Sequence, residues 1–224
     1  FDKEHFNEYL TFSRIGEGSI GGKARGLAFI DHLLHKHKLY EAFDGVKISI
    51  PQSVAISVDY FDQFIENNNL YFETIVNLKD DEILKKFIDA ELPEELIDKL
   101  KVFIKTLKKP LAIRSSSKLE DSTFQTFAGV YNTYMIPYNN DIEKTLKNLD
   151  IAIKSVYASV FYQNSRAYLA STSNLIDEEK MGIIIQEICG HEYNNYFYPT
   201  ISGVARSINY YPAGNEKPQD GIAN

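Results

Sequence analysis

Two apolar segments on either side of a long helical pattern constrain the fold of this chain most. The first, LAIRSS, begins at Leu111, and the second, MGIIIQEICG, begins at Met181. Short apolar runs of this kind predict buried strands. Between them, residues 141–169 carry apolar side chains at helical spacing, which predicts a long helix. Strands that flank a long helix, after a helix-rich first half, predict an α/β or α+β fold.

The first half of the chain is predicted to be mainly helical. Apolar residues follow helical spacing in residues 24–39, 60–67, 80–90 and 93–108, and Lys109-Pro110 ends the last of these helices. Residues 46–57 indicate short strand pieces around a proline, and residues 129–138 and 200–211 indicate further strands. With a boundary near Pro110, we expect two lobes, formed by residues 1–110 and 111–224.

Charge and cysteine content narrow the class of protein. The 224 residues carry a formal net charge of −7, so no general basic surface is available to attract nucleic acid. A phosphate ligand therefore requires a local cluster of cationic and N–H groups. The single cysteine, Cys189, excludes an internal disulfide framework, favours a reducing compartment and is expected to be buried. No apolar run approaches the roughly 20 residues of a membrane helix, so we expect a cytoplasmic protein without membrane partners.

The glycine-rich segment GEGSIGGKARG is the first candidate for phosphate binding. Its spacing Gly16-x-Gly18-x-x-Gly21 formally matches the dinucleotide fingerprint, but the preceding LTFSRI is a poor strand for that fold. It is not a Walker A loop either, because Ala24 stands where Ser or Thr is required. Backbone N–H groups at a helix start, joined by the Lys23 ammonium, would form an anion site. The alternative is a flexible turn with a solvated lysine.

The second candidate lies in LAIRSSSKLEDSTFQTFAGVY, where an apolar strand gives way to polar residues. The guanidinium of Arg114 is a rigid, charged fork suited to phosphate, and the three serines that follow add donors. Glu120 and Asp121 can orient Arg114 or help to hold a metal-bound phosphate. The segment STFQTFAG can fold over the site and exclude water. The alternative is a surface turn with an Arg–Glu ion pair.

Taken together, these segments resemble the N-terminal nucleotide-binding domain of phosphoenolpyruvate synthase and pyruvate phosphate dikinase. GGKARGL is similar to the GGKxxxL helix start of that family, and AIRSSS…EDS…FAGVY is similar to its RSS element and following loop. MGIIIQEICG resembles the strand that leads to the adenine-contacting linker, and SGVARSINYYP resembles the SGVxFTxxP segment. The resemblance implies a two-lobed, ATP-grasp-like domain with ATP between the lobes.

The resemblance also implies which residues bind ATP. Lys23 and Arg114 match the phosphate-contacting lysine and arginine and are the expected catalytic pair, acting with Mg²⁺, because phosphoryl transfer depends on positioning and charge neutralisation. Residues 123–129 match the phosphate-covering loop, and residues 186–189 match the linker that contacts adenine, largely through its backbone. The full set of expected ATP-binding residues besides this pair is Gly21, Gly22, Ser115, Ser116, Thr123, Gly129, Gln186, Glu187, Ile188, Cys189 and Arg206.

In complete enzymes of this family, ATP phosphorylates a histidine on a swivelling domain, and the histidine passes the phosphate to pyruvate on a barrel domain. We expect this chain to be part of such an enzyme, with the metal-binding carboxylates beyond Asn224, and to bind ATP weakly and without turnover by itself. Two alternatives stay open: a related dikinase that acts on a glucan or an antibiotic, and a non-catalytic nucleotide-binding regulatory module. Arg206 departs from the family pattern and either contacts phosphate or pairs with Glu187.

Overall fold

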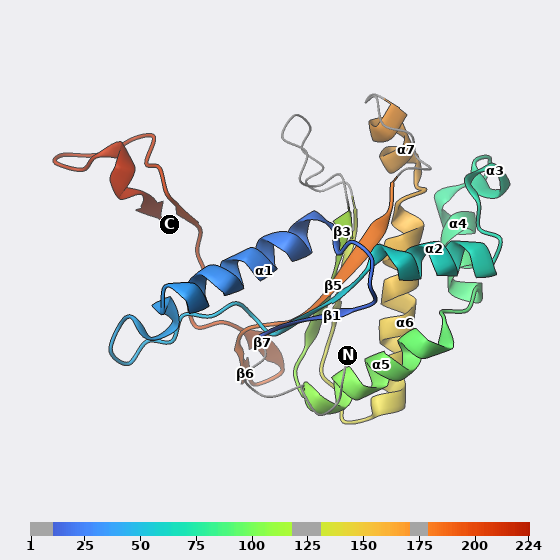
Figure 1. The fold of residues 1–224 in the computed structure, drawn as a ribbon, viewed down its shortest axis with the longest axis horizontal. Coiled ribbons are helices and arrows are strands. Elements are labelled where there is room, and N and C mark those ends of the chain that lie inside the picture. Colours follow the sequence, from blue (N-terminus) through green and yellow to red (C-terminus); the bar gives the residue numbers. More distant parts are fainter. Residues whose placement is uncertain (1–10, 118–130, 171–178) are drawn as a thin grey trace. The chain divides into compact units, whose positions relative to one another are not determined.

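A computed structural model describes residues 11–117, 131–170 and 179–224. The chain divides into two compact units, residues 1–188 and 189–224. The larger unit is built on a five-stranded sheet (Figure 1). Its strands, in spatial order, are β1 (Phe12–Ile15), β2 (Ser53–Ile56), β5 (Met181–Glu187), β3 (Leu111–Ser117) and β4 (Thr133–Ile136). The β1–β2 pair is parallel and the other pairs are antiparallel, so this is a mixed α/β fold as predicted.

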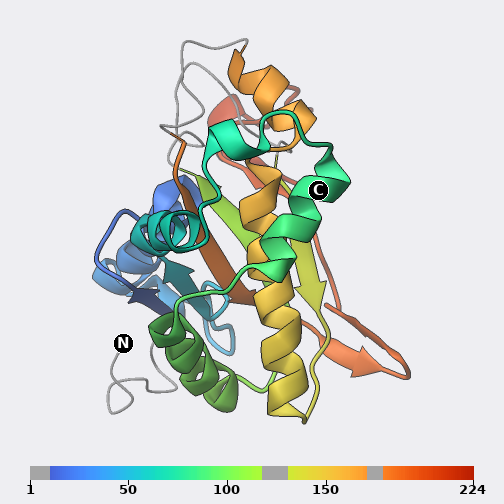
Figure 2. The ribbon, with the colours of Figure 1, turned by 90° about the vertical axis from the view of Figure 1, so that its right-hand side faces the viewer.

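Helices cover both faces of this sheet (Figures 1 and 2). Helix α1 (Gly21–Lys36) lies alone among the described long helices on one face, against β1, β3 and β5. The other face packs against α2 (Val58–Asn67) and α6 (Ile142–Ser159), and α4 (Asp80–Asp89) and α5 (Glu94–Thr106) pack in turn against α6. Shorter elements are a 3₁₀ turn (Leu39–Glu41), α3 (Phe72–Ile75) and α7 (Gln163–Ala170).

Strand β5 is buried on both faces, which explains why its sequence is apolar without alternation. Ile183 and Ile185 point into the main core on the side of α2 and α6, whereas Ile184 packs with Ala24 of α1 and Ala55 of β2. A strand that is buried on both faces needs apolar residues at every position. The main core continues into an aromatic cluster, whose members are Phe61, Phe64, Phe87, Tyr157 and Phe161.

The long helix expected over residues 141–169 is divided in two. Helix α6 ends at Ser159, and α7 begins at Gln163. The backbone N–H of Gln163 donates to the carboxylate of Asp80 at 2.9 Å, and Phe161 is buried between the two helices in the aromatic cluster. The break is therefore made by a contact with a residue far away in the sequence, which helical periodicity does not report.

The smaller unit consists of short strands with mainly exposed side chains. Strands β6 (His191–Tyr193) and β7 (Tyr196–Tyr198) form a hairpin, and β8 (Ala205–Arg206) pairs with β9 (Ile222–Ala223). A 3₁₀ turn (Pro218–Asp220) precedes β9. The strand expected over residues 200–211 was wrong in extent, because only β8 forms there. Ile201 is 87% exposed, and a two-stranded pair has no second layer against which a longer strand could bury its apolar side chains.

The expected boundary at Pro110 falls inside the larger unit, since β2 and β3, before and after it, belong to one sheet. The division into a lobe of residues 1–110 and a lobe of residues 111–224 stays a prediction about the arrangement around a ligand. Among the described helices, none combines the length and the apolar character needed to cross a membrane.

Candidate nucleotide site

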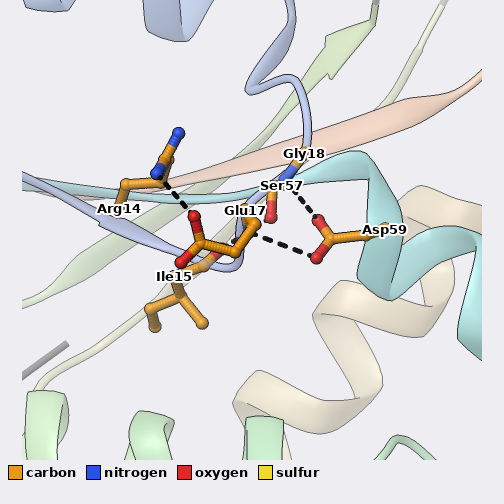
Figure 3. Close-up of polar contacts among 6 residues, drawn as sticks. All are labelled: Arg14, Ile15, Glu17, Gly18, Ser57 and Asp59. Atoms are coloured by element: carbon orange, nitrogen blue, oxygen red, sulfur yellow. Dashed lines mark hydrogen bonds and ion pairs between the residues drawn. The ribbon is translucent and has the colours of Figure 1, made fainter.

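The glycine-rich segment forms a turn between β1 and α1, and side chains from the start of α2 hold it (Figure 3). The Asp59 carboxylate accepts hydrogen bonds from the backbone N–H groups of Glu17 and Gly18, each at 3.2 Å. Ser57, the N-cap residue of α2, donates its hydroxyl to the Ile15 carbonyl at 2.8 Å. The turn is therefore fixed by the N-terminal end of α2 rather than left free in solvent.

These contacts set the charge of Asp59. Burial by itself would raise the pKa of this carboxyl, but hydrogen bonds from Ser57 and from the backbone N–H groups of Glu17, Asp59 and Gly18 outweigh burial and lower it. The Ser57 hydroxyl has one proton, which it donates to either Ile15 or Asp59, whereas the backbone donors serve the carboxylate in both cases. Asp59 is thus an anion at neutral pH, and it occupies N–H groups that a phosphate would need in a dinucleotide-binding loop.

The backbone of the turn lies directly against the side chains of Ser57 and Asp59 at the start of α2. Gly16 has a φ of +94°, and a Cβ atom there would lie 1.9 Å from the Ser57 hydroxyl oxygen. A Cβ on Gly18 would lie 2.8 Å from a carboxylate oxygen of Asp59. The glycine spacing that matches the dinucleotide fingerprint therefore serves to bring the turn against α2.

LTFSRI, which was expected to be a poor strand for the dinucleotide fold, contains β1 (Phe12–Ile15), which runs directly into the turn and pairs in parallel with β2. This strand lies at the edge of the sheet, and only Ile15 among its four residues is buried. An edge strand with one buried residue needs no continuous apolar run, which explains its unremarkable sequence.

Helix α1 begins directly against the end of β3. The Ser116 hydroxyl accepts a hydrogen bond from the Ala24 N–H at 3.0 Å and donates one to the Ile20 carbonyl at 2.7 Å. It therefore bridges two groups that are spaced to bond each other in a helical turn. Gly21 has a φ of +73°, and a Cβ atom there would lie 1.7 Å from the Ser116 carbonyl oxygen. Only glycine allows the helix start to approach the strand so closely.

Lys23 connects the first turn of α1 to the same strand. Its ammonium donates to the Ser115 carbonyl at 3.2 Å and to the Ser115 hydroxyl at 3.0 Å, across 92 positions of sequence. The Lys23 side chain is half-buried and Ser115 is buried. The positive end of the α1 dipole and the Lys23 charge therefore meet at the end of β3.

Arg114 lies one position before Ser115 and on the α1 side of the sheet. It pairs with Ile184 across β3 and β5, and the Ile184 side chain packs against Ala24 of α1. Side chains of residues directly opposite each other in an antiparallel pair share a face, so Arg114 also points to the α1 side. Within the described residues, the half-buried guanidinium makes no hydrogen bond or ion pair. None of the described residues therefore prevents a ligand from binding its fork of donors.

The other end of β5 is tied to the starts of β2 and β3. The Glu187 carboxylate pairs with Lys109 at 2.8 Å and accepts from the Gln52 N–H at 3.1 Å. The N–H groups of Glu187 and Ile188 donate to the carbonyls of Gln52 and Pro110, at 2.8 and 2.9 Å. The polar groups of this segment are thus largely engaged in holding three strands together.

The sequence matches a known family over nearly its whole length. A family profile described as "Pyruvate phosphate dikinase, AMP/ATP-binding domain" matches residues 17–223. The chain belongs to this family. It is similar to a Bacillus subtilis (strain 168) protein named "Uncharacterized phosphotransferase YvkC", with 29% identity over 189 residues, which cover 84% of this chain. The aligned region is 20% of that relative, so this chain spans about a fifth of its length.

Within this dikinase ATP-binding domain, the structure brings together six of the thirteen site residues that the sequence singled out. Gly21, Gly22 and Lys23 open α1 beside β3, which carries Arg114, Ser115 and Ser116. Gln186 lies at the opposite end of β5, where its amide donates to the Ser53 hydroxyl at 3.2 Å. Thr123 and Gly129, with Glu120, Asp121 and the rest of the expected covering loop, lie outside the described residues.

Two expected residues belong to the smaller unit. Cys189 is exposed, so the expectation that it is a buried structural cysteine was wrong. It follows the end of β5, at the start of the smaller unit. Arg206 lies in β8 and is exposed. Its role toward phosphate stays a prediction, and Glu187 already pairs with Lys109 inside the larger unit.

Asp59 is the residue of this domain that sequence reasoning missed. Its position in the first turn of α2 signals only a helix N-terminus, where acidic residues are common. The bonds to Glu17 and Gly18 span 42 and 41 positions, and no local pattern announces them. The one usable signal was the high density of glycine in this turn, which indicates that its backbone lies close to another segment of the chain.

Proposed function

We propose that this domain binds Mg·ATP on the α1 face of β3 and β5, within a phosphotransferase of the phosphoenolpyruvate synthase and pyruvate phosphate dikinase type. Lys23 and Arg114 would contact the phosphates. The phosphoryl group would pass to a histidine on a separate domain and from there to pyruvate. The observation that carries this proposal is the placement of the Lys23 ammonium at 3.0 and 3.2 Å from Ser115, the residue next to Arg114.

The proposed phosphate end has the electrostatics that phosphoryl transfer requires. Lys23 and the N-terminus of the 16-residue helix α1 lie beside the C-terminal half of β3, and Arg114, at the middle of that strand, points to the α1 side of the sheet. Positive groups fixed before the reaction stabilise the charge that spreads over the transferred phosphoryl oxygens. The acceptor lies on another domain in this mechanism, so no nucleophile is needed among the described residues.

The adenine end would lie along β5. The strand advances by about 13 Å from Gly182, which is opposite Ser116, to Gln186, a length that an extended nucleotide would span. Ile184, between them, is covered by Ala24 of α1, so the nucleotide would pass beside α1 rather than over Ile184. The N–H groups of Glu187 and Ile188 are already hydrogen-bonded. We therefore assign adenine recognition in this segment to carbonyl oxygens that accept from the exocyclic amine.

Magnesium enters this proposal as part of the Mg·ATP substrate. In the part of the chain that the structure describes, no group of three His, Cys, Asp or Glu side chains is placed to hold a metal ion. We assign no metal ligands to these residues, and the expected carboxylates beyond Asn224 stay a prediction.

Calorimetric titration of Mg·ATP into the full-length protein tests the binding site. We expect Lys23→Ala and Arg114→Ala each to weaken binding by at least about tenfold, as the loss of a charge-assisted contact of about 1.5–3 kcal/mol implies. Arg114→Lys should restore little, because an ammonium does not reproduce the guanidinium fork. Lys36→Ala, at the exposed C-terminal end of α1, is the matched control and should bind like wild type. Unchanged affinity in both site variants would refute the assignment.

The acceptor requires a separate experiment. ATP labelled at both the β- and the γ-phosphate should label the full-length protein on histidine, with a phosphate that is stable to base and released by acid. Release of that label on addition of pyruvate, with formation of phosphoenolpyruvate, supports the synthase or dikinase reaction. Release to a glucan or an antibiotic instead would favour the related dikinases. ATP binding without any labelling would favour the regulatory module.

A further inference from the structure

We propose that Asp59 is a positioning residue of the nucleotide site, which acts by fixing the turn that delivers Lys23 to the phosphates. This inference rests on the proposed function. Asp59 is not expected to touch ATP. Its carboxylate binds the N–H groups of Glu17 and Gly18 at 3.2 Å each, on the side of the turn that faces α2 (Figure 3).

The chain between this anchor and Lys23 is short. Gly18, which bonds Asp59, and Lys23 are separated by four residues, and the Val58 N–H adds a bond to the Ser19 carbonyl at 2.8 Å. On the far side, Ser116 bonds Ile20 and Ala24. The turn is thus held from α2 on one side and from β3 on the other. Loss of one anchor leaves the glycine-rich turn free to move, and with it the start of α1.

The carboxylate also decides which N–H groups remain for a ligand. Asp59 engages the N–H groups of Glu17 and Gly18, so a bound phosphate is directed to the first turn of α1. There Ser19 and Ser116 already accept from the N–H groups of Gly21 and Ala24, and those of Gly22 and Lys23 have no intrahelical acceptor. A negative side chain in the turn further disfavours a phosphate placed there. Asp59 therefore favours the position beside Lys23 over the one that a dinucleotide would occupy.

The test compares Asp59→Ala and Asp59→Asn in the full-length protein by titration with Mg·ATP. Asparagine keeps one acceptor oxygen and loses the charge, so its affinity should lie between those of wild type and alanine. We expect Asp59→Ala to weaken binding by up to about tenfold, since a misplaced Lys23 would lose its charge-assisted contact with phosphate, the same loss as is expected of Lys23→Ala. Asp62→Asn is the matched control, because it lies on the same helix and pairs with Lys180.

Hydrogen exchange over the turn provides a readout that a general loss of stability does not reproduce. We expect faster exchange in Asp59→Ala at residues 16–20, with β5 and α6 as protected as in wild type. If the alanine variant unfolds, the asparagine variant carries the test by the same two measurements. Wild-type affinity in Asp59→Asn together with wild-type or merely globally raised exchange in Asp59→Ala would overturn the inference.

This experiment separates the inference from the function on which it rests. Failure of the wild-type protein to bind Mg·ATP refutes the proposed function. Weak binding in Lys23→Ala combined with wild-type binding in both Asp59 variants leaves the function standing and overturns the role of Asp59. Weak binding in Lys23→Ala, graded loss in the Asp59 variants and wild-type binding in Asp62→Asn support both.

Discussion

Helix α1 approaches β3 closely at Gly21, and adding one methyl group there should be strongly destabilising. The φ of +73° costs a residue with a Cβ atom about 1–2 kcal/mol. The added carbon would lie 1.7 Å from the Ser116 carbonyl oxygen and 2.4 Å from its carbon, far inside the usual contact distance. Because both obstructing atoms are backbone, α1 or β3 must shift, and overpacking of this kind adds about 1–3 kcal/mol.

We therefore expect Gly21→Ala to lower the free energy of unfolding by about 2–5 kcal/mol. Gly26→Ala is the matched control on the same helix, because a Cβ atom there meets nothing within 4 Å. Replacing this exposed helical glycine should stabilise the protein by about 0.5–1 kcal/mol. Urea unfolding followed by circular dichroism measures both, with the slope of the transition checked for constancy. Equal stability of the two variants would refute the close packing of α1 against β3.

Three further predictions concern single side chains. Ser116→Ala should cost about 1–3 kcal/mol in urea unfolding, because it removes the partner of one buried N–H group and one carbonyl of α1; a wild-type midpoint would contradict the bridge. Tyr157→Phe should leave stability unchanged or raise it by about 1 kcal/mol, since the fully buried hydroxyl finds no partner among the described residues and burial raises its pKa; a large loss in thermal unfolding would reveal a hidden partner. The stability difference between wild type and Asp59→Asn should be constant at neutral pH and shrink below about pH 4. The reason is that the pKa of Asp59 is lower in the folded state, so its carboxylate stabilises the fold above the unfolded-state pKa, and this stabilisation is lost as the pH falls through the folded-state pKa. A difference that grows on acidification would contradict that sign.

The helices of the first half were predictable because each carries its own signal. The periodic apolar positions of residues 60–67, 80–90 and 93–108 place α2, α4 and α5 within a few residues of their observed bounds. An amphipathic helix is defined by spacing that lies within one segment, so it can be read locally. The break between α6 and α7 could not, since its cause is the bond from Gln163 to Asp80, 83 positions away.

The sequence by itself also determined the chemical identity of the candidate site. Lys23, Arg114 and the serines after it stand out because cations and hydroxyls interrupt glycine-rich or apolar runs, and residue types are local facts. Only the tertiary structure decided that Lys23 reaches Ser115 and that Asp59 fills the glycine-rich turn. Both depend on the register of strands and on backbones that meet within a methyl group's width. Such short distances arise when two segments pack together, and that packing cannot be inferred from the sequence of either segment alone.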